Sequence, residues 1–396
     1  MNKPDILSRT LILSTAALLL AGTFGAYAGQ TNAESPAPAQ ASFSVAPTAA
    51  LDQPAWSRTT DRFQAAINGN TVYYQFDSKL IVANASTGKT KWTFANISSC
   101  PMLTLNNSVY AATTNGQIVK LSSISGKAIW TKDAPGKSAN ASDLYMPNNF
   151  RLSGTNLYVS DSKGLTQISA VSGKTIRNLP EIKTLPLGIS GSTVICTTTS
   201  SGSEMRETLE AYHNKTGKRL WEVEGNHNEI LALRSGYLYT RAIPMQTDQG
   251  YASVIDKVNL KTGKIVKSFN YMPVDSIDQK GVVFTVISGK YVYMVQGGDQ
   301  SHRIQRIALD APSDTKPEII AELNGSIIAF EVAGNRIAAL LDNGTLNVLD
   351  RDTGNLRTSA TVKAEHDSRL TVQNGKVFVE SGTTLSMIQI SLFGHN

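Results

Sequence analysis

The residues whose types and spacing most invite a chemical role lie near the C-terminal end of the chain, in the segment Asp350-Arg351-Asp352-Thr353-Gly354. Carboxylates at alternate positions before a glycine occur in the calcium-binding loops of EF-hand proteins. The third acidic position and the distal Glu of such a loop are missing here. Because a similar Thr-Gly or Ser-Gly step recurs along the chain without the acids, we interpret this segment as a turn and predict no metal site.

Histidine and cysteine supply no alternative site. The histidines share no spacing typical of metal ligands: His213, His227, His302, His366 and His395. The two cysteines, Cys100 and Cys196, are far apart and form no Cys-x-x-Cys pair. An oxidising compartment would allow them one disulfide, but we favour two separate buried thiols. Since the chain has neither a Gly-x-Ser-x-Gly motif nor a P-loop, the sequence predicts no catalytic residue.

A repeated turn organises most of the chain. The Thr-Gly or Ser-Gly step, usually followed by Lys, has its glycines at Gly88, Gly126, Gly173, Gly217, Gly263 and Gly354. Their spacings are 38, 47, 44, 46 and 91 residues, and the last covers two periods with a degenerate copy at Ile307-Ala308-Leu309-Asp310. A period of about 40 to 45 residues is typical of β-propeller blades.

Short alternating runs rich in Val, Ile and Tyr surround each repeated turn. Asn-Gly and Thr-Gly steps accept the positive φ that tight hairpins require, so each repeat is predicted to form one four-stranded antiparallel sheet. One twisted sheet of this size cannot bury both of its faces, whereas a ring of such sheets buries each against the next. We therefore predict an all-β fold, a β-propeller of four-stranded blades spanning residues 51–396.

The two ends of the repeat region set the number of blades. The last repeat supplies three strands, near Leu370, Lys376 to Glu380, and Leu385 to Ile390. The segment Pro54-Ala55-Trp56-Ser57-Arg58, ahead of the first full repeat, is typical of the missing fourth strand. Pairing of the N- and C-terminal strands would close eight blades of about 42 residues each, with seven blades as the alternative.

Three tryptophans, Trp92, Trp130 and Trp221, each follow a turn glycine by four residues. A wide flat ring at this position is predicted to fill the wedge between neighbouring blades rather than to stack on a ligand. With the segments Thr87 to Trp92 and Leu349 to Gly354, the pattern resembles the repeat of pyrroloquinoline-quinone (PQQ) enzymes, which runs roughly ALDAxTGxxxW. The resemblance covers about Phe63 to Ile390 and implies the blade type.

The resemblance to PQQ enzymes does not extend to their chemistry. The quinone dehydrogenases with this repeat carry an adjacent cysteine pair, a calcium site and a catalytic Asp, and no residue of this sequence corresponds to them. We therefore expect a non-catalytic member that holds neither PQQ nor calcium. Within this class the chain resembles the propeller lipoproteins of outer-membrane barrel assembly, except that no cysteine near the leader can accept a lipid.

The N-terminal residues are typical of an exported protein. Lys3 and Arg9 precede a short apolar run that ends at Ala26-Tyr27-Ala28, so residues 1–28 are predicted to be a signal peptide, with an uncleaved anchor as the alternative. Residues 29–50 are rich in Ala, Pro, Ser and Gln and are predicted to be a disordered tether. The chain released by cleavage would be secreted or extracytoplasmic, with no membrane span. Its mild, dispersed positive charge argues against nucleic-acid binding.

Interruptions of the repeat indicate where a ligand would bind. Three consecutive repeats have extended loops between their second and third strands: Ser200 to Thr208, Ile243 to Ser253 and Gly297 to Arg303. In a propeller these loops emerge on the face that also carries the connections between blades. The candidate ligand-binding residues on that face are Glu204, Arg206, Glu207, Arg241, Gln246, Asp248, Tyr251, Asp299, His302, Arg303, His227 and Tyr145. Their mixed polarity suits a protein, peptide or glycan.

A second candidate surface consists of the lysines that follow the turn glycines: Lys89, Lys127, Lys174, Lys218 and Lys264. The repeat places them on one face near the rim, where they could bind anionic polymers or lipid headgroups. Solvation and protection of exposed edge strands explain them as well, and we favour that structural reading.

The sequence thus favours a monomeric, exported, non-catalytic propeller that binds or scaffolds partners at the cell envelope. The alternative is a quinoprotein-type or other propeller enzyme with its site at the central channel.

Overall fold

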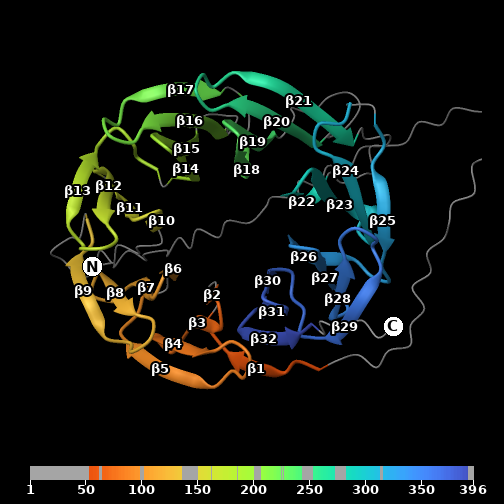
Figure 1. Cartoon of the computed structure of the whole chain (residues 1–396), viewed down its shortest axis with the longest axis horizontal. Helices are drawn as coiled ribbons and strands as arrows, with labels where there is room; N and C mark the ends of the chain where they lie inside the picture. Colours follow the sequence, from red (N-terminus) through yellow and green to blue (C-terminus); the bar gives the residue numbers. More distant parts are fainter. Residues whose placement is uncertain are drawn as a thin grey trace, which may run out of the picture. The chain divides into compact units, whose positions relative to one another are not determined.

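The computed structural model describes residues 53–61, 65–98, 102–135, 150–161, 163–184, 186–199, 207–223, 225, 227–242, 253–272, 282–312 and 315–390. In this part of the chain, eight four-stranded antiparallel sheets stand side by side in a ring (Figure 1). We number these blades 1 to 8 and call the strands of each blade a to d, from the centre of the ring to its rim. The prediction of an eight-bladed propeller is confirmed.

Blades 1 to 4 follow one another along the chain. Blade 1 contains β2 (Ala66–Asn68), β3 (Thr71–Phe76), β4 (Lys79–Asn84) and β5 (Thr90–Ala95), and blade 2 contains β6 (Leu103–Leu105), β7 (Ser108–Ala112), β8 (Gln117–Ser122) and β9 (Ala128–Asp133). Blade 3 contains β10 (Phe150–Ser153), β11 (Asn156–Asp161), β12 (Gly164–Ser169) and β13 (Thr175–Leu179), and blade 4 contains β14 (Gly188–Ser190), β15 (Thr193–Thr199), β16 (Glu207–His213) and β17 (Arg219–Val223).

Blades 5 to 8 complete the ring. Blade 5 contains β18 (His227–Arg234), β19 (Tyr237–Ala242), β20 (Ser253–Asn259) and β21 (Ile265–Met272), and blade 6 contains β22 (Val282–Ser288), β23 (Tyr291–Gln296), the short 3-10 helix η1 (Gly298–Gln300), β24 (Arg303–Ala308) and β25 (Glu318–Glu322). Blade 7 contains β26 (Ile327–Ala333), β27 (Arg336–Leu341), β28 (Thr345–Asp350) and β29 (Leu356–Thr361). Blade 8 contains β30 (Arg369–Gln373), β31 (Lys376–Ser381), β32 (Thr384–Gln389) and β1 (Trp56–Thr59).

Burial differs between the strands of a blade because neighbouring blades cover the inner strands on both faces. In blade 2, every residue of strand b, β7, is buried, whereas strand d, β9, alternates between exposed and half-buried residues. The apolar core is accordingly divided into clusters that join two blades each. One such cluster contains Tyr110 and Ile118 of blade 2 together with Leu157 and Ile168 of blade 3. Among the described residues, no helix is long and apolar enough to cross a membrane.

Blade 8 combines the two ends of the described chain. Strand β1 pairs antiparallel with β32, with Trp56 opposite Met387 and Thr59 opposite Thr384. The backbone N–H of Ala55 also donates to the carbonyl of Met387, at 2.8 Å. The predicted closure by the N- and C-terminal strands is therefore confirmed.

Tryptophans join consecutive blades at four of the contacts between neighbouring blades, which we call seams. Trp92 of blade 1 donates its indole N–H to the carbonyl of Ser123 in blade 2, at 3.0 Å. A Cβ on Gly126 of the same blade 2 turn would lie only 2.8 Å from the Trp92 ring, so the ring lies directly against this glycine. The same arrangement joins Trp56 to Gly88, Trp130 to Gly173 and Trp221 to Gly263. The predicted role of the tryptophans between blades is confirmed.

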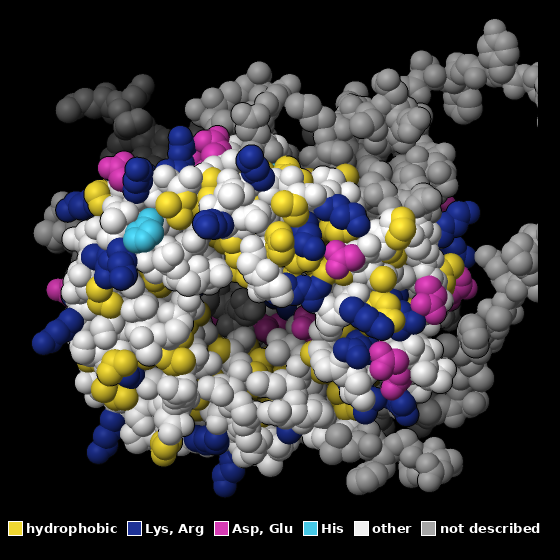
Figure 2. Space-filling model, turned by 45° about the horizontal axis from the view of Figure 1, so that its top comes forward, with side chains coloured by type: hydrophobic (Ala, Val, Ile, Leu, Met, Phe, Trp, Pro, Cys, Tyr) yellow, Lys and Arg dark blue, Asp and Glu magenta, His cyan; other side chains and the backbone are white. Residues whose placement is uncertain are grey.

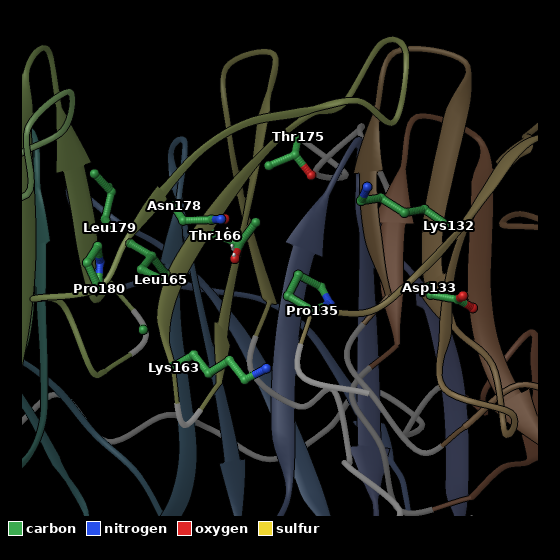
Figure 3. Close-up of a pocket in the computed structure, with 11 residues that line it drawn as sticks. Lys132, Asp133, Pro135, Lys163, Leu165, Thr166, Thr175, Asn178, Leu179 and Pro180 are labelled. Carbon is green, nitrogen blue, oxygen red and sulfur yellow. Dashed lines mark hydrogen bonds between the residues drawn. The ribbon is translucent and has the colours of Figure 1, made fainter. Parts of the chain in front are cut away.

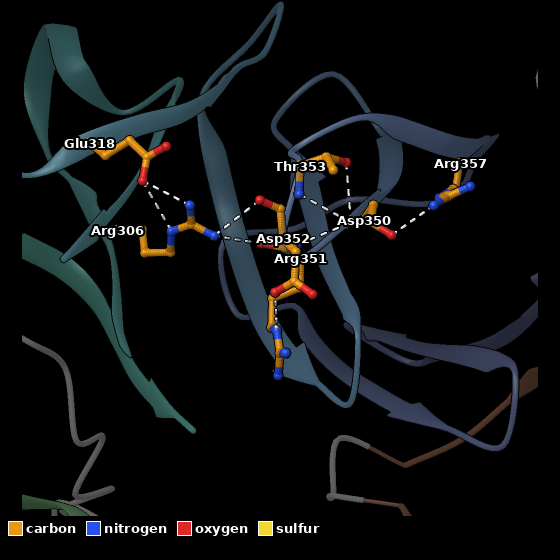
Figure 4. A network of polar contacts seen from close by, with 7 residues as sticks. All are labelled: Arg306, Glu318, Asp350, Arg351, Asp352, Thr353 and Arg357. Carbon is orange, nitrogen blue, oxygen red and sulfur yellow. Dashed lines mark hydrogen bonds and ion pairs between the residues drawn. The ribbon is translucent and has the colours of Figure 1, made fainter. Parts of the chain in front are cut away.

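At two of the seams without tryptophan, basic side chains donate to the turn of the next blade. Lys267 of blade 5 stands four residues after its turn glycine, and its Nζ lies 3.3 Å from the carbonyl of Asp310 in blade 6. Arg306 of blade 6 donates to the carbonyls of Arg351 and Asp352 in blade 7, and also binds Glu318 of its own blade at 2.8 Å (Figure 4). Cationic groups thus replace the indole N–H as donors to the turn of the next blade.

The carboxylate of Asp350 accepts the hydrogen bonds that stabilise its own turn (Figure 4). One oxygen of Asp350 accepts hydrogen bonds from the backbone N–H groups of Asp352 and Thr353, and the other accepts one from Arg357 at 2.7 Å. The Arg357 guanidinium and these N–H donors hold the pKa of Asp350 at about 2. These contacts support the interpretation of the segment as a turn.

The two faces of the ring carry different connections. In seven blades, an N–H of the c–d turn donates to a carbonyl of the a–b turn, as from Ser123 to Asn107 and from Leu260 to Gly236. We call this side the turn face. The opposite side carries the b–c loops and the connections between blades, and we call it the loop face. The ring is hollowed at its centre (Figure 2).

The closure by β1 predicts a specific cost of truncation. Deleting residues 1–61 removes Trp56 from the core and leaves β32 as an unpaired edge, so we expect a loss of more than about 3 kcal/mol in unfolding free energy. The matched control starts at Gln53 and retains β1. Thermal and urea unfolding of the two truncated chains should differ clearly, and equal stability would contradict closure through β1.

The tryptophan contacts predict non-additive mutations. Trp92→Leu should cost about 3 kcal/mol by removing the ring and its hydrogen bond, and Gly126→Ala should also destabilise because its Cβ would meet that ring. The double variant should lose less than the sum of the single losses, since the smaller leucine side chain leaves room for the new methyl group. Urea unfolding measures this cycle, with Thr93→Ala on the exposed side of β5 as control. Additive losses would mean that the two residues do not act as a unit.

Candidate functional site

Only part of the predicted ligand-binding set belongs to the described residues. Glu204, Arg206, Gln246, Asp248, Tyr251 and Tyr145 lie outside them. The described members are Glu207 in blade 4, His227 and Arg241 in blade 5, and Asp299, His302 and Arg303 in blade 6. All six lie toward the loop-face ends of their blades, in three consecutive blades.

The blade 5 member Arg241 is held by an acid of its own sheet. Its guanidinium lies 3.0 Å from the Glu229 carboxylate, and the two residues are direct partners across β18 and β19. The Arg241 side chain is mostly buried, whereas that of Glu229 is exposed. The pair therefore presents a carboxylate to solvent with a cation fixed behind it.

The b–c loop of blade 6 is anchored to the connection that leads into blade 7. The carbonyls of Ser301 and His302 accept hydrogen bonds from the N–H groups of Ile327 and Leu323, both at 2.9 Å. Arg303 lies 2.8 Å from Glu322 and also contacts Gln300. Asp299 is exposed on η1, and His302 is half-buried beside it. This loop is thus a fixed polar surface in which Asp299 is the accessible charge.

His227 occupies a different environment from the other predicted residues. Its ring is buried, at 2% exposure, and Nε2 lies 2.8 Å from the Asp256 carboxylate. Ser268 donates to the other oxygen of Asp256 at 2.5 Å. In a catalytic triad the serine hydroxyl contacts the imidazole, which acts as its base. Here the hydroxyl of Ser268 binds the carboxylate instead, so His227 is not placed to activate it. The three residues position β18 against β20 and β21 from within the blade.

A cavity of about 490 Å3 opens between blades 2 and 3 (Figure 3). Its walls are Lys132, Asp133, Pro135, Lys163, Gly164, Leu165, Thr166, Thr175, Asn178, Leu179 and Pro180. Blade 2 contributes Lys132 and Asp133 to one side of the cavity, and blade 3 contributes Leu165, Leu179 and Pro180 to the other, together with Lys163 (Figure 3). A lining with both charged and apolar side chains suits an extended peptide or a sugar ring better than an ion alone.

The tight bend at Gly164 shapes this cavity. Gly164 has φ +128°, and a Cβ there would lie 2.6 Å from the Cα of Pro180. Thr166 Oγ1 also lies 3.2 Å from Asn178 Oδ1 across β12 and β13. None of the candidate ligand-binding residues named from the sequence lines this cavity, so the sequence prediction missed Lys132, Lys163 and Asn178. A Lys-Asp pair at the end of an outer strand carries no pattern that separates it from other strand ends.

The structure does not gather the described candidates into one catalytic constellation. No group of three or more His, Cys, Asp or Glu residues in the described ranges is arranged to hold a metal ion. Cys196 is a free, fully buried thiol, and burial raises its pKa to about 12. Cys100 lies outside the described residues. The five turn lysines are exposed on the turn face, opposite the predicted ligand-binding set.

One carboxyl of the loop face is perturbed. Glu380 of β31 accepts the backbone N–H of Ala65 at 2.8 Å, in the connection between β1 and β2. Burial raises the pKa of Glu380 to about 7, although the Ala65 N–H and the charge of Arg369 oppose this shift. Its ionisation is therefore coupled to the packing of blade 8 against blade 1.

The sequence matches the family model described as outer membrane protein assembly factor BamB, over residues 48–184 and again over residues 106–266. Together the two matches span more than half of the chain. The chain belongs to this family of PQQ-like β-propeller repeat proteins. The overlap of the two matches agrees with the internal repetition of the blades. No curated protein matches the chain.

Solved structures share the fold at low sequence identity. The crystal structure of the computationally designed protein Ika8 has a TM-score of 0.59 and 14% identity, and covers 86% of this chain and 100% of its own. The crystal structure of BamB from Moraxella catarrhalis has a TM-score of 0.52 and 16% identity, and covers 88% of this chain and 100% of its own. Both similarities concern the ring architecture.

The raised pKa of Glu380 predicts a pH dependence of stability. Below the ordinary pKa of a glutamate, near 4.5, the carboxyl is neutral in both the folded and the unfolded state. Because the folded pKa is higher, the folded state loses stability as pH rises from about 4.5 through 7. Glu380→Gln should therefore stabilise the protein at pH 8 and have little effect at pH 4.5, as measured by thermal unfolding. Glu365→Gln, at a partly exposed carboxyl of the same blade, is the control, and an equal response of both variants would contradict this assignment.

Proposed function

We propose that this protein is an exported, non-catalytic β-propeller that acts as a binding or scaffold module of the cell envelope. The observation that carries the proposal is the match of more than half of the chain to a family described as an outer-membrane protein assembly factor. The N-terminal residues, with their basic start, apolar run and Ala26-Tyr27-Ala28 site, support export by a cleaved leader.

The loop face of blades 4 to 6 supports the binding part of the proposal. Its described side chains are polar and held by neighbours in the same blade, as in the Arg241–Glu229 and Arg303–Glu322 pairs. A surface whose charges are already oriented loses little conformational entropy on binding. Such a surface suits a polar protein, peptide or glycan of the envelope.

The residues that could do chemistry support a non-catalytic role. His227 and Asp256 are buried within blade 5, and Cys196 is a buried thiol with a raised pKa. The two cysteines of the chain cannot form the adjacent pair that lies over the quinone in PQQ dehydrogenases. We accordingly propose that the protein uses neither PQQ nor calcium, and added PQQ and calcium with an artificial electron acceptor should give no turnover.

The proposal predicts loss of partner binding when the loop face is changed. The full mature chain is used to capture partners from solubilised envelope fractions, and the affinity of an identified partner is then measured by calorimetry. Asp299→Arg combined with His302→Ala should weaken that affinity at least about tenfold without changing thermal stability, because both side chains lie outside the core. Shortening the three extended b–c loops to four-residue turns should abolish binding.

The matched control changes charges on the turn face, as Lys127→Gln with Lys174→Gln. This control should leave partner affinity unchanged. Equal affinity of the wild-type chain and all loop-face variants would refute the proposed binding face.

A further inference from the structure

Exposed apolar side chains are concentrated in one sector of the ring. Nine large hydrophobic side chains of the described chain are exposed, and seven of them lie in the c–d turns or at the start of strand d in blades 2 to 5. The seven are Ile124, Ile129, Val171, Ile176, Leu220, Ile265 and Val266, with exposed fractions between 42% and 74%. Scattered single apolar residues are ordinary on a surface, but this clustering over neighbouring blades needs a cause.

Six of the seven residues, all except Ile265, occupy two equivalent positions in successive repeats. Blade 2 has Ile124-Ser125-Gly126-Lys127-Ala128-Ile129, and blade 3 has Val171-Ser172-Gly173-Lys174-Thr175-Ile176. In both segments an apolar residue stands at the tip of the turn, a lysine follows the glycine, and an isoleucine is the second residue of the outer strand. Blades 4 and 5 repeat the last two features with Leu220 and Val266.

The same sector is basic. The four turn segments 122–129, 169–176, 213–220 and 259–266 contain seven Lys or Arg residues and no Asp or Glu. The a–b turns beside them, at 105–108, 153–156, 190–193 and 234–237, contain no acid either. Of the seven cations, Arg219 is engaged by Glu210 and Glu222, both at 2.9 Å. The lysines Lys127, Lys174, Lys218 and Lys264 are all exposed.

Blades 6 and 7 mark the end of this sector. Their c–d turns carry Asp310, Asp350 and Asp352, and Arg351 in the blade 7 turn is paired with Asp352 at 3.2 Å. In Figure 2, Lys and Arg side chains are spread around the ring, and the fewer acidic side chains lie at its upper edge, on its right-hand side, at its left edge and in the central hollow. The combination of apolar and exposed basic groups without acids is therefore specific to the turns of blades 2 to 5.

We propose that the turn face of blades 2 to 5 docks on the surface of an anionic lipid bilayer. The apolar turn tips Ile124 and Val171 would enter the boundary between headgroups and acyl chains, and the lysines beside them would contact anionic headgroups. A soluble polyanion would need the charges but not the apolar tips. The charge of this sector, which lacks acids over four consecutive turns, is complementary to such a membrane.

This docking leaves the loop face free. In seven blades the a–b and c–d turns are hydrogen-bonded to each other on one side, and strands b and c are connected at their ends on the other side. A propeller seated on a bilayer through its turn face would hold its loop face toward solvent. The inference therefore stands independently of the partner-binding site proposed above.

Vesicle binding tests the proposal directly. The full mature chain is sedimented with large vesicles of phosphatidylcholine, with or without phosphatidylglycerol, at low and high salt. We expect binding only with the anionic lipid. Lys127→Gln combined with Lys174→Gln should weaken binding by about fivefold for each charge removed at low salt, and this effect should shrink at high salt.

The apolar contribution is tested separately. Ile124→Ser combined with Val171→Ser should weaken binding at least about tenfold at both salt concentrations, because screening does not act on apolar insertion. Phe76→Ser, at an exposed apolar residue of the loop face, and Lys132→Gln with Lys163→Gln, in the same blades but on the loop face, are matched controls. These controls should bind vesicles like the unaltered chain, and all variants should unfold at similar temperatures.

Three results would overturn the proposal. The first is absence of binding to vesicles that contain phosphatidylglycerol. The second is equal loss of binding in the loop-face controls. The third is retention of full vesicle binding by the Ile124 and Val171 variant, which would indicate a purely electrostatic polyanion site.

Discussion

A four-stranded blade of this chain has two apolar faces, and only its two neighbours can cover them. The strands next to the centre show this most clearly, because β7 is buried along its whole length while β9 at the rim is half exposed. Each hydrophobic cluster consequently belongs to two blades rather than to one. The stability of the ring therefore comes mainly from the contacts between neighbouring blades, and it depends on which side chains fill each of these seams.

At six of the eight seams, a side chain of one blade donates to a carbonyl in the c–d turn of the next blade, and two kinds of donor do this. At four of them an indole lies against the turn glycine of the next blade and donates to a backbone carbonyl near it. Lys267 donates to the carbonyl of Asp310, and Arg306 donates to those of Arg351 and Asp352, in the corresponding turns of the next blades. A donor from one blade to the turn of the next is thus present at these seams, whereas the side chain that supplies it varies.

The repeat allowed the ring, the number of blades and the closing strand to be predicted, because turn glycines and alternating strands are local features. The role of Trp92 also followed from its spacing. The donor role of Lys267 did not, since its acceptor is a backbone carbonyl in another blade and leaves no residue pattern.

The burial of His227 depends on Asp256, which is 29 residues away, so the position of the histidine in a predicted loop suggested a more exposed side chain. The cavity between blades 2 and 3 forms where strand ends of two different blades diverge. The sequence of either blade alone does not predict this separation. The six predicted loop-face residues that belong to the described part of the chain lie on three consecutive blades, but as separate groups rather than as one cluster.

The pairing of β1 with β32 also governs how such a chain can reach its native state. Ser57 and Ser386 share a hydrogen bond of 2.8 Å although 329 residues separate them in the sequence. The strand that is synthesised first therefore finds its partner only after nearly the whole chain has left the ribosome. Until then both terminal blades expose an apolar face and an unsatisfied strand edge, which is the state most open to aggregation. Contacts between such distant segments also slow folding, because the entropy of closing the largest loop opposes the final step. Folding of the ring is therefore slow and open to aggregation, but in the folded molecule every blade is covered by a neighbour on both sides.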